Sequence, residues 1–349
     1  MKRRRKAFSS LAAAAMLLCA FTLPGGAAAL QKDKAANYIR TQTDGYTVKQ
    51  SVSPENYQAM QSSLAKQGLT KREINRQLLI ETGFLKESDI SLQHVLDAME
   101  TGDAIETVTQ YVKVTPSGQE IHMGKDAFER ESANVITERT GQTRAPSQDI
   151  GGTEEPPSSY NGYVRMAITY IRNKQAPNKY FYLSMGLLEW VIMPATRMTD
   201  AMSFYSDSLV WNDKNSNQYK DYWLVWEADY RETDVGYTNY GKEYTETDAH
   251  KVEKNPGGFY FSFRLPSTIT YLNYTKTYTR FQIIISGIGE LQNNNINTFE
   301  LFLQYAHKKI GISTDASFSW SVGTKYPGVT FSIFPNVGNT YYRLTKKVV

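Results

Sequence analysis

The sequence predicts a small N-terminal α+β domain followed by a larger all-β domain. Signals for helix ends are confined to the first third of the chain. Of the 44 Tyr, Phe and Trp residues, 36 lie between residues 160 and 349. In that region short runs of alternating apolar and polar residues are separated by Gly, Pro and Asn, as in antiparallel strands. We therefore expect an antiparallel β-sandwich of jelly-roll or immunoglobulin-like type, with a closed barrel as the alternative.

Residues 1–29 have the layout of a cleavable signal peptide. Five basic residues lie between Met1 and Lys6, an apolar run extends from Ala7 to Leu23, and Ala27 and Ala29 form an A-x-A cleavage site. The apolar run is shorter than the roughly 20 residues that a spanning helix needs. We expect a secreted, extracellular protein that is cleaved near Ala29 and keeps no stable membrane span.

Cleavage would change two arguments from composition. The full chain has 39 basic and 35 acidic residues, and loss of the five basic residues leaves 34 against 35. A nearly neutral protein gives no support for a nucleic-acid-binding surface. The single cysteine, Cys19, lies inside the signal. The mature protein would therefore have neither a disulfide nor thiolate chemistry.

Residues 30–137 are expected to form the α+β domain. Ser53 is a candidate N-cap, Pro54 fits the first helical position, and Gly68 closes this helix. Thr70 and Glu73 have the spacing of a capping box. The remaining expected elements are a second helix over 71–82 that stops at Gly83, a third over 91–100, and strands over 106–114 and 121–123.

Residues 138–162 contain almost no apolar side chains and are rich in Gly, Pro, Ser and Thr. Such a segment cannot bury enough surface to order itself, so we interpret it as a flexible linker.

Residues 163–349 are expected to form the aromatic-rich β-sandwich. Alternation is clearest in residues 222–230, 259–265, 299–305 and 317–322. About nine to eleven strands with one apolar face each would account for this pattern.

The sequence contains no recognisable catalytic or cofactor motif. Its histidines lie far apart, at His94, His122, His250 and His307, whereas metal sites usually show close ligand pairs. No GxSxG, SxxK or phosphate-binding glycine pattern is present. The two helices around Leu69 resemble a helix-turn-helix in outline, but in an exported neutral protein a plain helical hairpin is favoured. We expect no metal and no cofactor, and the sequence favours a binding protein over an enzyme.

One strand carries a candidate ligand platform. If Tyr222, Leu224, Trp226, Ala228 and Tyr230 face the core, then Trp223, Glu227 and Asp229 share the outer face. An aromatic ring beside two carboxylates suits a sugar, which stacks its C–H face on the ring and bonds its hydroxyls to the acids. Alternatively, the acidic residues form an ordinary solvated strand face, or Glu227 and Asp229 are the acid and base of a glycosidase.

The connection from Arg231 to Gly258 is expected to be a long loop. Tyr237, Tyr240 and Tyr244 are interleaved there with Gly, Asn and acidic residues, a composition suited to recognition. A plain surface hairpin is the alternative, and Ca²⁺ binding by the acidic residues has no EF-hand spacing to support it.

The stretch 268–286 resembles in composition the strands of secreted pore-formers. One of its faces is expected to carry Leu272, Tyr274, Lys276, Tyr278, Arg280 and Gln282. Neither face is cleanly apolar, so an exposed sandwich strand is the better interpretation.

Three functions follow as hypotheses. The first is an extracellular binding or adhesion protein that recognises a glycan or a surface protein through Trp223, Glu227, Asp229, Tyr237, Tyr240 and Tyr244. The second is a secreted hydrolase of polysaccharides. The third is a membrane-active β toxin with an N-terminal pro-segment.

Overall fold

The structure is a computed structural model of the 349-residue chain. It describes residues 37–86, 96, 99, 102–116, 119–141, 161–176, 179–194, 199–206, 208–211, 222–234, 237–248, 253–255, 258–291, 299–308, 319–322, 327–330 and 339–348. The predicted signal peptide lies outside these residues, as do most of the predicted third helix and the central part of the predicted linker.

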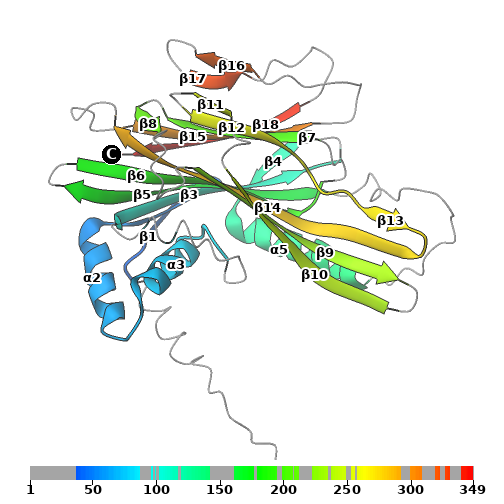
Figure 1. Cartoon of the computed structure of the whole chain (residues 1–349). Helices are drawn as coiled ribbons and strands as arrows, with labels where there is room; N and C mark the ends of the chain where they lie inside the picture. Colours follow the sequence, from blue (N-terminus) through cyan, green and yellow to red (C-terminus); the bar gives the residue numbers. More distant parts are fainter. Residues whose placement is uncertain are drawn as a thin grey trace, which may run out of the picture.

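The described chain is mostly antiparallel β-sheet with few helices (Figure 1). The helices are α2 (Pro54–Ala65), α3 (Lys71–Glu81) and α5 (Lys125–Gly141). The strands up to the middle of the chain are β1 (Arg40–Asp44), β2 (Thr47–Val52), β3 (Gly102–Val114), β4 (Glu120–Met123), β5 (Gly162–Ala176), β6 (Lys179–Ile192), β7 (Thr199–Ser206) and β8 (Leu209–Trp211). The later strands are β9 (Tyr222–Asp234), β10 (Tyr237–Asp248), β11 (Glu253–Asn255), β12 (Gly258–Arg264), β13 (Ile269–Tyr271), β14 (Tyr274–Leu291), β15 (Phe299–Lys308), β16 (Ser319–Val322), β17 (Pro327–Thr330) and β18 (Asn339–Val348).

One large sheet organises the molecule. Its strand order is β1-β2-β3-β5-β6-β14-β9-β10, with β4, β8 and β13 paired to strands along this path. A five-stranded sheet has the order β11-β12-β7-β15-β18, and β16 and β17 form a separate pair. Both long paths have two ends among the described strands, so these strands do not form the closed arrangement that was the alternative prediction.

The two faces of the large sheet are buried by different partners. On one face, Val164, Trp190 and Ile283 share an apolar cluster with Phe204 and Leu303 of the five-stranded sheet. Figure 1 shows this second sheet layered over that face. Alternation along the strands sends every second residue to either face, which is why apolar residues occupy both sides of β5, β6 and β14.

The opposite face of the large sheet is covered by helices. Leu64 of α2 and Leu78 of α3 are buried in one cluster with Ala167, Leu187 and Ile284 of the sheet. Phe128 of α5 packs with Tyr111 and Tyr163 in a smaller cluster. In Figure 1 the arm formed by β9, β10, β13 and the first half of β14 extends beyond α2 and α3.

The helix ends follow the local signals in the sequence. Ser53 caps α2 by accepting a hydrogen bond from the Asn56 N–H at 3.3 Å, and Pro54 occupies the first turn. Thr70 and Glu73 form the predicted capping box at the start of α3. Gly68 and Gly83 have φ of 90° and 71°, a conformation that glycine adopts without steric cost. These helix predictions are confirmed, and β3 begins four residues before the predicted strand.

The large sheet joins strands from both sides of the predicted linker. β3 pairs with β5 from Gly102↔Asn173 to Val114↔Gly162, so the N-terminal strands and the aromatic-rich strands share one hydrogen-bonded ladder. α5 also continues to Gly141, inside the segment predicted as linker. The domain boundary itself stays a prediction.

The segment predicted as a long loop after Arg231 is instead a strand pair. β9 continues to Asp234 and β10 returns beside it in an unbroken register from Tyr237↔Asp234 to Asp248↔Trp223. Thr and Tyr recur in this segment, and they suit an exposed sheet despite the charged residues between them. The plain hairpin, which was the alternative interpretation, is the arrangement observed.

No helix in the described ranges combines the length and the apolar character that a membrane crossing requires.

Candidate ligand-binding site

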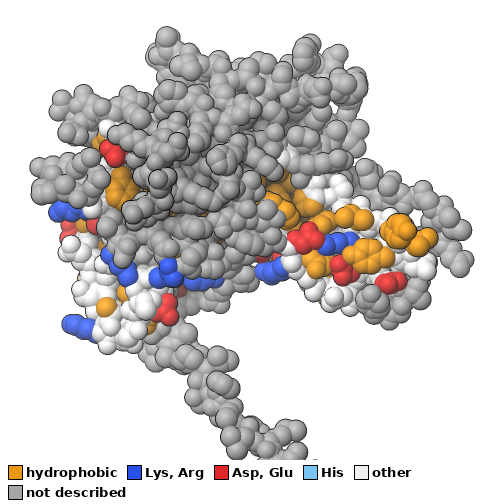
Figure 2. Space-filling view, in the orientation of Figure 1, with side chains coloured by type: hydrophobic (Ala, Val, Ile, Leu, Met, Phe, Trp, Pro, Cys, Tyr) orange, Lys and Arg blue, Asp and Glu red, His pale blue; other side chains and the backbone are white. Residues whose placement is uncertain are grey.

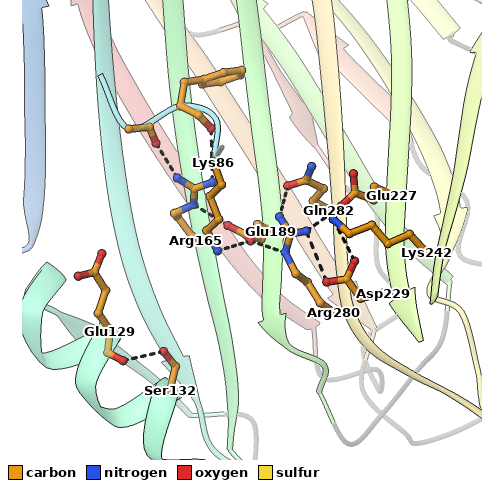
Figure 3. Close-up of polar contacts among 12 residues, drawn as sticks. Lys86, Glu129, Ser132, Arg165, Glu189, Glu227, Asp229, Lys242, Arg280 and Gln282 are labelled. Carbon is orange, nitrogen blue, oxygen red and sulfur yellow. Dashed lines mark hydrogen bonds and ion pairs between the residues drawn. The ribbon is translucent and has the colours of Figure 1, made fainter. Parts of the chain in front are cut away.

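A row of charged side chains crosses the helix-covered face of the large sheet (Figure 3). Five consecutive strands of the sheet contribute to it: Arg165 from β5, Glu189 from β6, Arg280 and Gln282 from β14, Glu227 and Asp229 from β9, and Lys242 from β10. Lys86, from the segment after α3, joins the row. The pairings Arg165↔Glu189, Gln282↔Glu189 and Gln282↔Glu227 place these residues side by side.

Glu189 is the centre of the row. Its side chain is 0% exposed and accepts hydrogen bonds from Arg165 Nε at 2.7 Å, Arg280 Nε at 2.6 Å and Lys86 Nζ at 2.6 Å. Burial alone would raise the pKa of this carboxyl group, but Arg165, Arg280 and Lys86 together hold the pKa of Glu189 well below its usual value. The group is therefore ionised and fully paired.

Arg165 ties this row to the helical layer. Its guanidinium donates to the Gly83 carbonyl oxygen at 2.5 Å and to the Phe84 carbonyl oxygen at 3.4 Å, directly after α3. Hydrogen bonds from a charged donor are stronger than those between neutral groups. Arg165 and Glu189 therefore fix the segment after α3 against the sheet.

Arg280 reaches the row because β14 contains a β-bulge. Tyr278 pairs with Tyr230 and Arg280 pairs with Asp229, so Thr279 is an extra residue without a partner in the register. The prediction that Tyr278 and Arg280 share one face is therefore wrong. A bulge changes the phase of the alternation, and here it turns Arg280 toward Glu189 and Glu227.

Glu227 and Asp229 lie at the end of the row that faces the arm. Glu227 is 1% exposed and accepts hydrogen bonds from Arg280 at 2.9 Å and from Lys242 at 3.0 Å. Asp229 lies 3.8 Å from Arg280 and 3.7 Å from Lys242, within ion-pair range but beyond hydrogen-bond distance. The two predicted carboxylates do share one face, but Glu227 is buried rather than displayed.

Three alternate residues of β9 carry buried polar atoms that lack a hydrogen-bond partner in the described structure. These atoms are Glu227 Oε2, Asp229 Oδ1 and Arg231 Nε. Successive same-face positions on a strand are about 7 Å apart, so two acceptors and one donor are spaced along one surface. Buried polar atoms are nearly always satisfied in proteins, and a cluster of exceptions calls for an explanation such as a bound polar molecule.

The neighbouring strand places exposed side chains beside these atoms. Tyr240 pairs with Arg231 and Lys242 pairs with Asp229, and directly opposed residues lie on the same face. Tyr240 is 64% exposed. This surface, formed by Glu227, Asp229, Arg231, Tyr240 and Lys242, is called the β9–β10 platform below. It combines an open aromatic side chain with both hydrogen-bond acceptors and donors.

The other predicted site residues are placed only by their backbone. Tyr244 pairs with Glu227, and Trp223 pairs with Asp248, so both positions belong to the same face of the sheet as the platform. Tyr237 pairs with Asp234, and this position belongs to the opposite face. The side chains of Trp223, Tyr237 and Tyr244 lie outside what the structure describes.

Sequence reasoning missed Arg165, Glu189, Arg280, Lys242 and Lys86. A usable signal was present, because Arg165 and Glu189 each interrupt a short apolar run of their strands. Charged residues are rarely buried unless they are paired, so such an interruption indicates an ion pair across strands. Among the described residues, no group of three or more His, Asp, Glu or Cys side chains is arranged to hold a metal ion.

Comparisons with known proteins do not assign this chain to a family. No protein-family profile matches it, and no curated protein matches it. One solved structure, described as "AvmM Catalyzes Macrocyclization in Alchivemycin A Biosynthesis", has 11% identity and a TM-score of 0.16, with 52% of this chain and 79% of that chain covered. Another, described as "Complete structure of manganese lipoxygenase of Gaeumannomyces graminis and partial structure of zonadhesin of Komagataella pastoris", has 6% identity and a TM-score of 0.19, with 70% and 88% covered. Similarities of this size support no argument about fold or function.

Proposed function

We propose that this is a secreted binding protein that recognises a carbohydrate through the β9–β10 platform. The observation that carries the proposal is the set of buried atoms without a hydrogen bond on Glu227, Asp229 and Arg231, beside the exposed ring of Tyr240. A sugar hydroxyl both donates and accepts hydrogen bonds, so one ligand can satisfy carboxylate oxygens and the guanidinium together. Its C–H face can stack on Tyr240.

Secretion of the protein is part of this proposal. The basic start, apolar run and A-x-A site of residues 1–29 support a signal peptide, and a secreted protein would meet polysaccharides and glycoproteins outside the cell.

A β-sandwich of jelly-roll or immunoglobulin-like type is also proposed. The apolar cluster shared by the two facing sheets supports it. The ladder between β3 and β5 argues against an N-terminal α+β domain that folds by itself.

The hydrolase hypothesis receives less support from the same geometry. Arg280 and Lys242 both lie beside Glu227 and Asp229, so the two carboxylates share the same pair of cations. Glycosidases instead give their two carboxyl groups different environments, one for the acid and one for the base or nucleophile.

The toxin hypothesis requires the stretch 268–286 to leave the sheet. Residues 281–286 of β14 pair with β6 on one side and with β9 on the other. Removing a central strand would break both ladders.

A pull-down from solution tests the proposed function. The purified chain without residues 1–29 is mixed with insoluble polysaccharides, bacterial cell walls and immobilised glycoproteins, beside Asp229→Asn and Tyr240→Ala variants. Tyr46→Ala is the matched control, because Tyr46 is an exposed tyrosine on the β1–β2 turn. Retention on one matrix that both platform variants lose and Tyr46→Ala keeps would support the proposal. Absence of retention on every matrix, or equal retention of all variants, would contradict it.

A further inference from the structure

The tip of the β13–β14 hairpin displays large apolar side chains. β13 and β14 are joined by the two residues Leu272 and Asn273, and Tyr271 pairs with Tyr274 at the turn. Ile269, Tyr271 and Leu272 are 51%, 72% and 84% exposed. Figure 2 shows hydrophobic side chains gathered on the projecting arm. These three residues are called the hairpin tip below.

Leu272 combines this exposure with backbone strain. Its φ is 50°, and among the described residues it alone has a positive φ without being glycine. Glycine, asparagine or aspartate usually occupies such positions in two-residue hairpins, because a side chain crowds the backbone there. The chain thus keeps a leucine where glycine would relieve strain and where the side chain is mostly in solvent. An outlier of this kind is a reason to look for a function.

The hairpin tip is also free of ionised groups. No charged residue occurs from Leu265 to Thr275. On the adjoining part of the arm, Lys276 forms ion pairs with Glu243 and Glu232, and Tyr274 donates a hydrogen bond to Glu232 at 2.7 Å. The backbone of the tip is paired from Ile269↔Lys276 to Tyr271↔Tyr274. Moving residues 269–272 into an apolar medium would therefore desolvate no charged side chain of the hairpin tip.

We propose that the hairpin tip docks into the interfacial region of a phospholipid membrane as a peripheral contact. Leu272 enters among the acyl chains, and Tyr271 lies at the headgroup level, where tyrosine is enriched in membrane proteins. A protein partner fits less well, because a standard protein interface needs roughly 800 Å² on each side and the tip is a narrow convex turn. Because the tip carries no charge, the contact should not depend on anionic lipid.

Sedimentation with phosphatidylcholine vesicles tests the inference. The chain without residues 1–29 is compared with Leu272→Gly, which should fold at least as well because it relieves the positive φ. We expect Leu272→Gly to lower vesicle partitioning about fivefold or more, from the lost burial of one leucine side chain. Tyr46→Ser, at the exposed β1–β2 turn, and Tyr240→Ala, on the platform, should partition as the parent does.

A second readout locates the contact. Leu272→Trp places an indole at the apex, and its emission should shift to the blue when phosphatidylcholine vesicles are added. No vesicle association of the parent chain, equal association of Leu272→Gly, or an unshifted Leu272→Trp emission would each overturn the inference. Because Tyr240→Ala separates sugar binding from vesicle binding, failure of one proposal is distinguishable from failure of the other.

Discussion

Arg280 and Tyr278 lie on opposite faces of the same strand although only one residue separates them. Tyr278 pairs with Tyr230 and packs with the apolar cluster between the sheets, whereas Arg280 pairs with Asp229 and donates to Glu189 and Glu227. In a regular strand the two side chains would share a face. The bulge at Thr279 therefore decides whether the buried carboxylates have a cationic partner from β14.

Deleting Thr279 should remove the bulge and leave the charged row in place. Tyr278 and Arg280 would then be adjacent in a regular strand and point to opposite faces, so the pairings Tyr278↔Tyr230 and Arg280↔Asp229 are kept. Inserting one alanine after Thr279 should instead turn Arg280 away from Glu189 or shift the rest of β14 by one residue, so that its apolar residues change face. Measured by urea unfolding, we expect the insertion to cost at least as much stability as Arg280→Ala and the deletion to cost much less. A deletion as destabilising as the insertion would show that the phase of β14 does not position Arg280.

Replacing Glu189 should destabilise the protein strongly. Glu189→Gln removes the buried charge that faces Arg165 and Arg280, and breaking a buried pair in this way costs about 3–5 kcal/mol. Urea unfolding followed by circular dichroism measures the change. Glu129→Gln is the control, because Glu129 is exposed and pairs only loosely with Lys125, at 3.9 Å. A loss below about 1 kcal/mol for Glu189→Gln would contradict the central role of this residue.

The contribution of Glu189 to the free energy of unfolding should decrease as the pH falls. The pKa of Glu189 is lower in the folded protein than its usual value of 4.5, so the folded state binds this proton less readily than the unfolded state. The stability it provides is fully present above pH 4.5 and is lost as the pH falls toward the depressed pKa. The difference in unfolding free energy between the parent chain and Glu189→Gln should thus be constant from pH 7 to pH 5 and shrink below pH 4. A difference that grows at low pH would be inconsistent with an ionised Glu189.

The helices could be predicted from the sequence because their signals are local. Ser53 caps the N–H of Asn56 three residues later, Thr70 and Glu73 are three residues apart, and Gly68 and Gly83 follow the ends of the two helices. The charged row could not be predicted in the same way. The partners Arg165, Arg280 and Lys86 lie 24, 91 and 103 residues from Glu189, so the pairing depends on strand order.

The candidate site was predicted in part. Alternation correctly placed Glu227 and Asp229 on one face, because β9 is regular from Tyr222 to Asp234. The prediction that Glu227 is exposed was wrong. Arg280 and Lys242, which come from the neighbouring strands, hydrogen-bond to this carboxylate in its buried position. The bulge at Thr279 could not be predicted from the residue type, because threonine is also common in regular strands.

Tyr240 should contribute to affinity through its ring rather than its hydroxyl. If a sugar stacks on it, Tyr240→Phe and Tyr240→Trp should retain binding, whereas Tyr240→Ala should weaken it about tenfold, a loss typical of an aromatic contact. Titration calorimetry with the saccharide that the pull-down retains measures the three affinities. Equal affinity of Tyr240→Ala and the parent chain would remove Tyr240 from the site.

The most direct test of the β9–β10 platform combines changes in the protein with changes in the ligand. Deoxy analogues of the retained saccharide are titrated against the parent chain and against Asp229→Ala by calorimetry. We expect one analogue to bind the parent chain at least tenfold more weakly than the full saccharide. Asp229→Ala should show no such difference, because the missing hydroxyl is the one that donates a hydrogen bond to Asp229. If every analogue loses the same factor against both proteins, Asp229 does not meet the ligand and the platform is not the binding site.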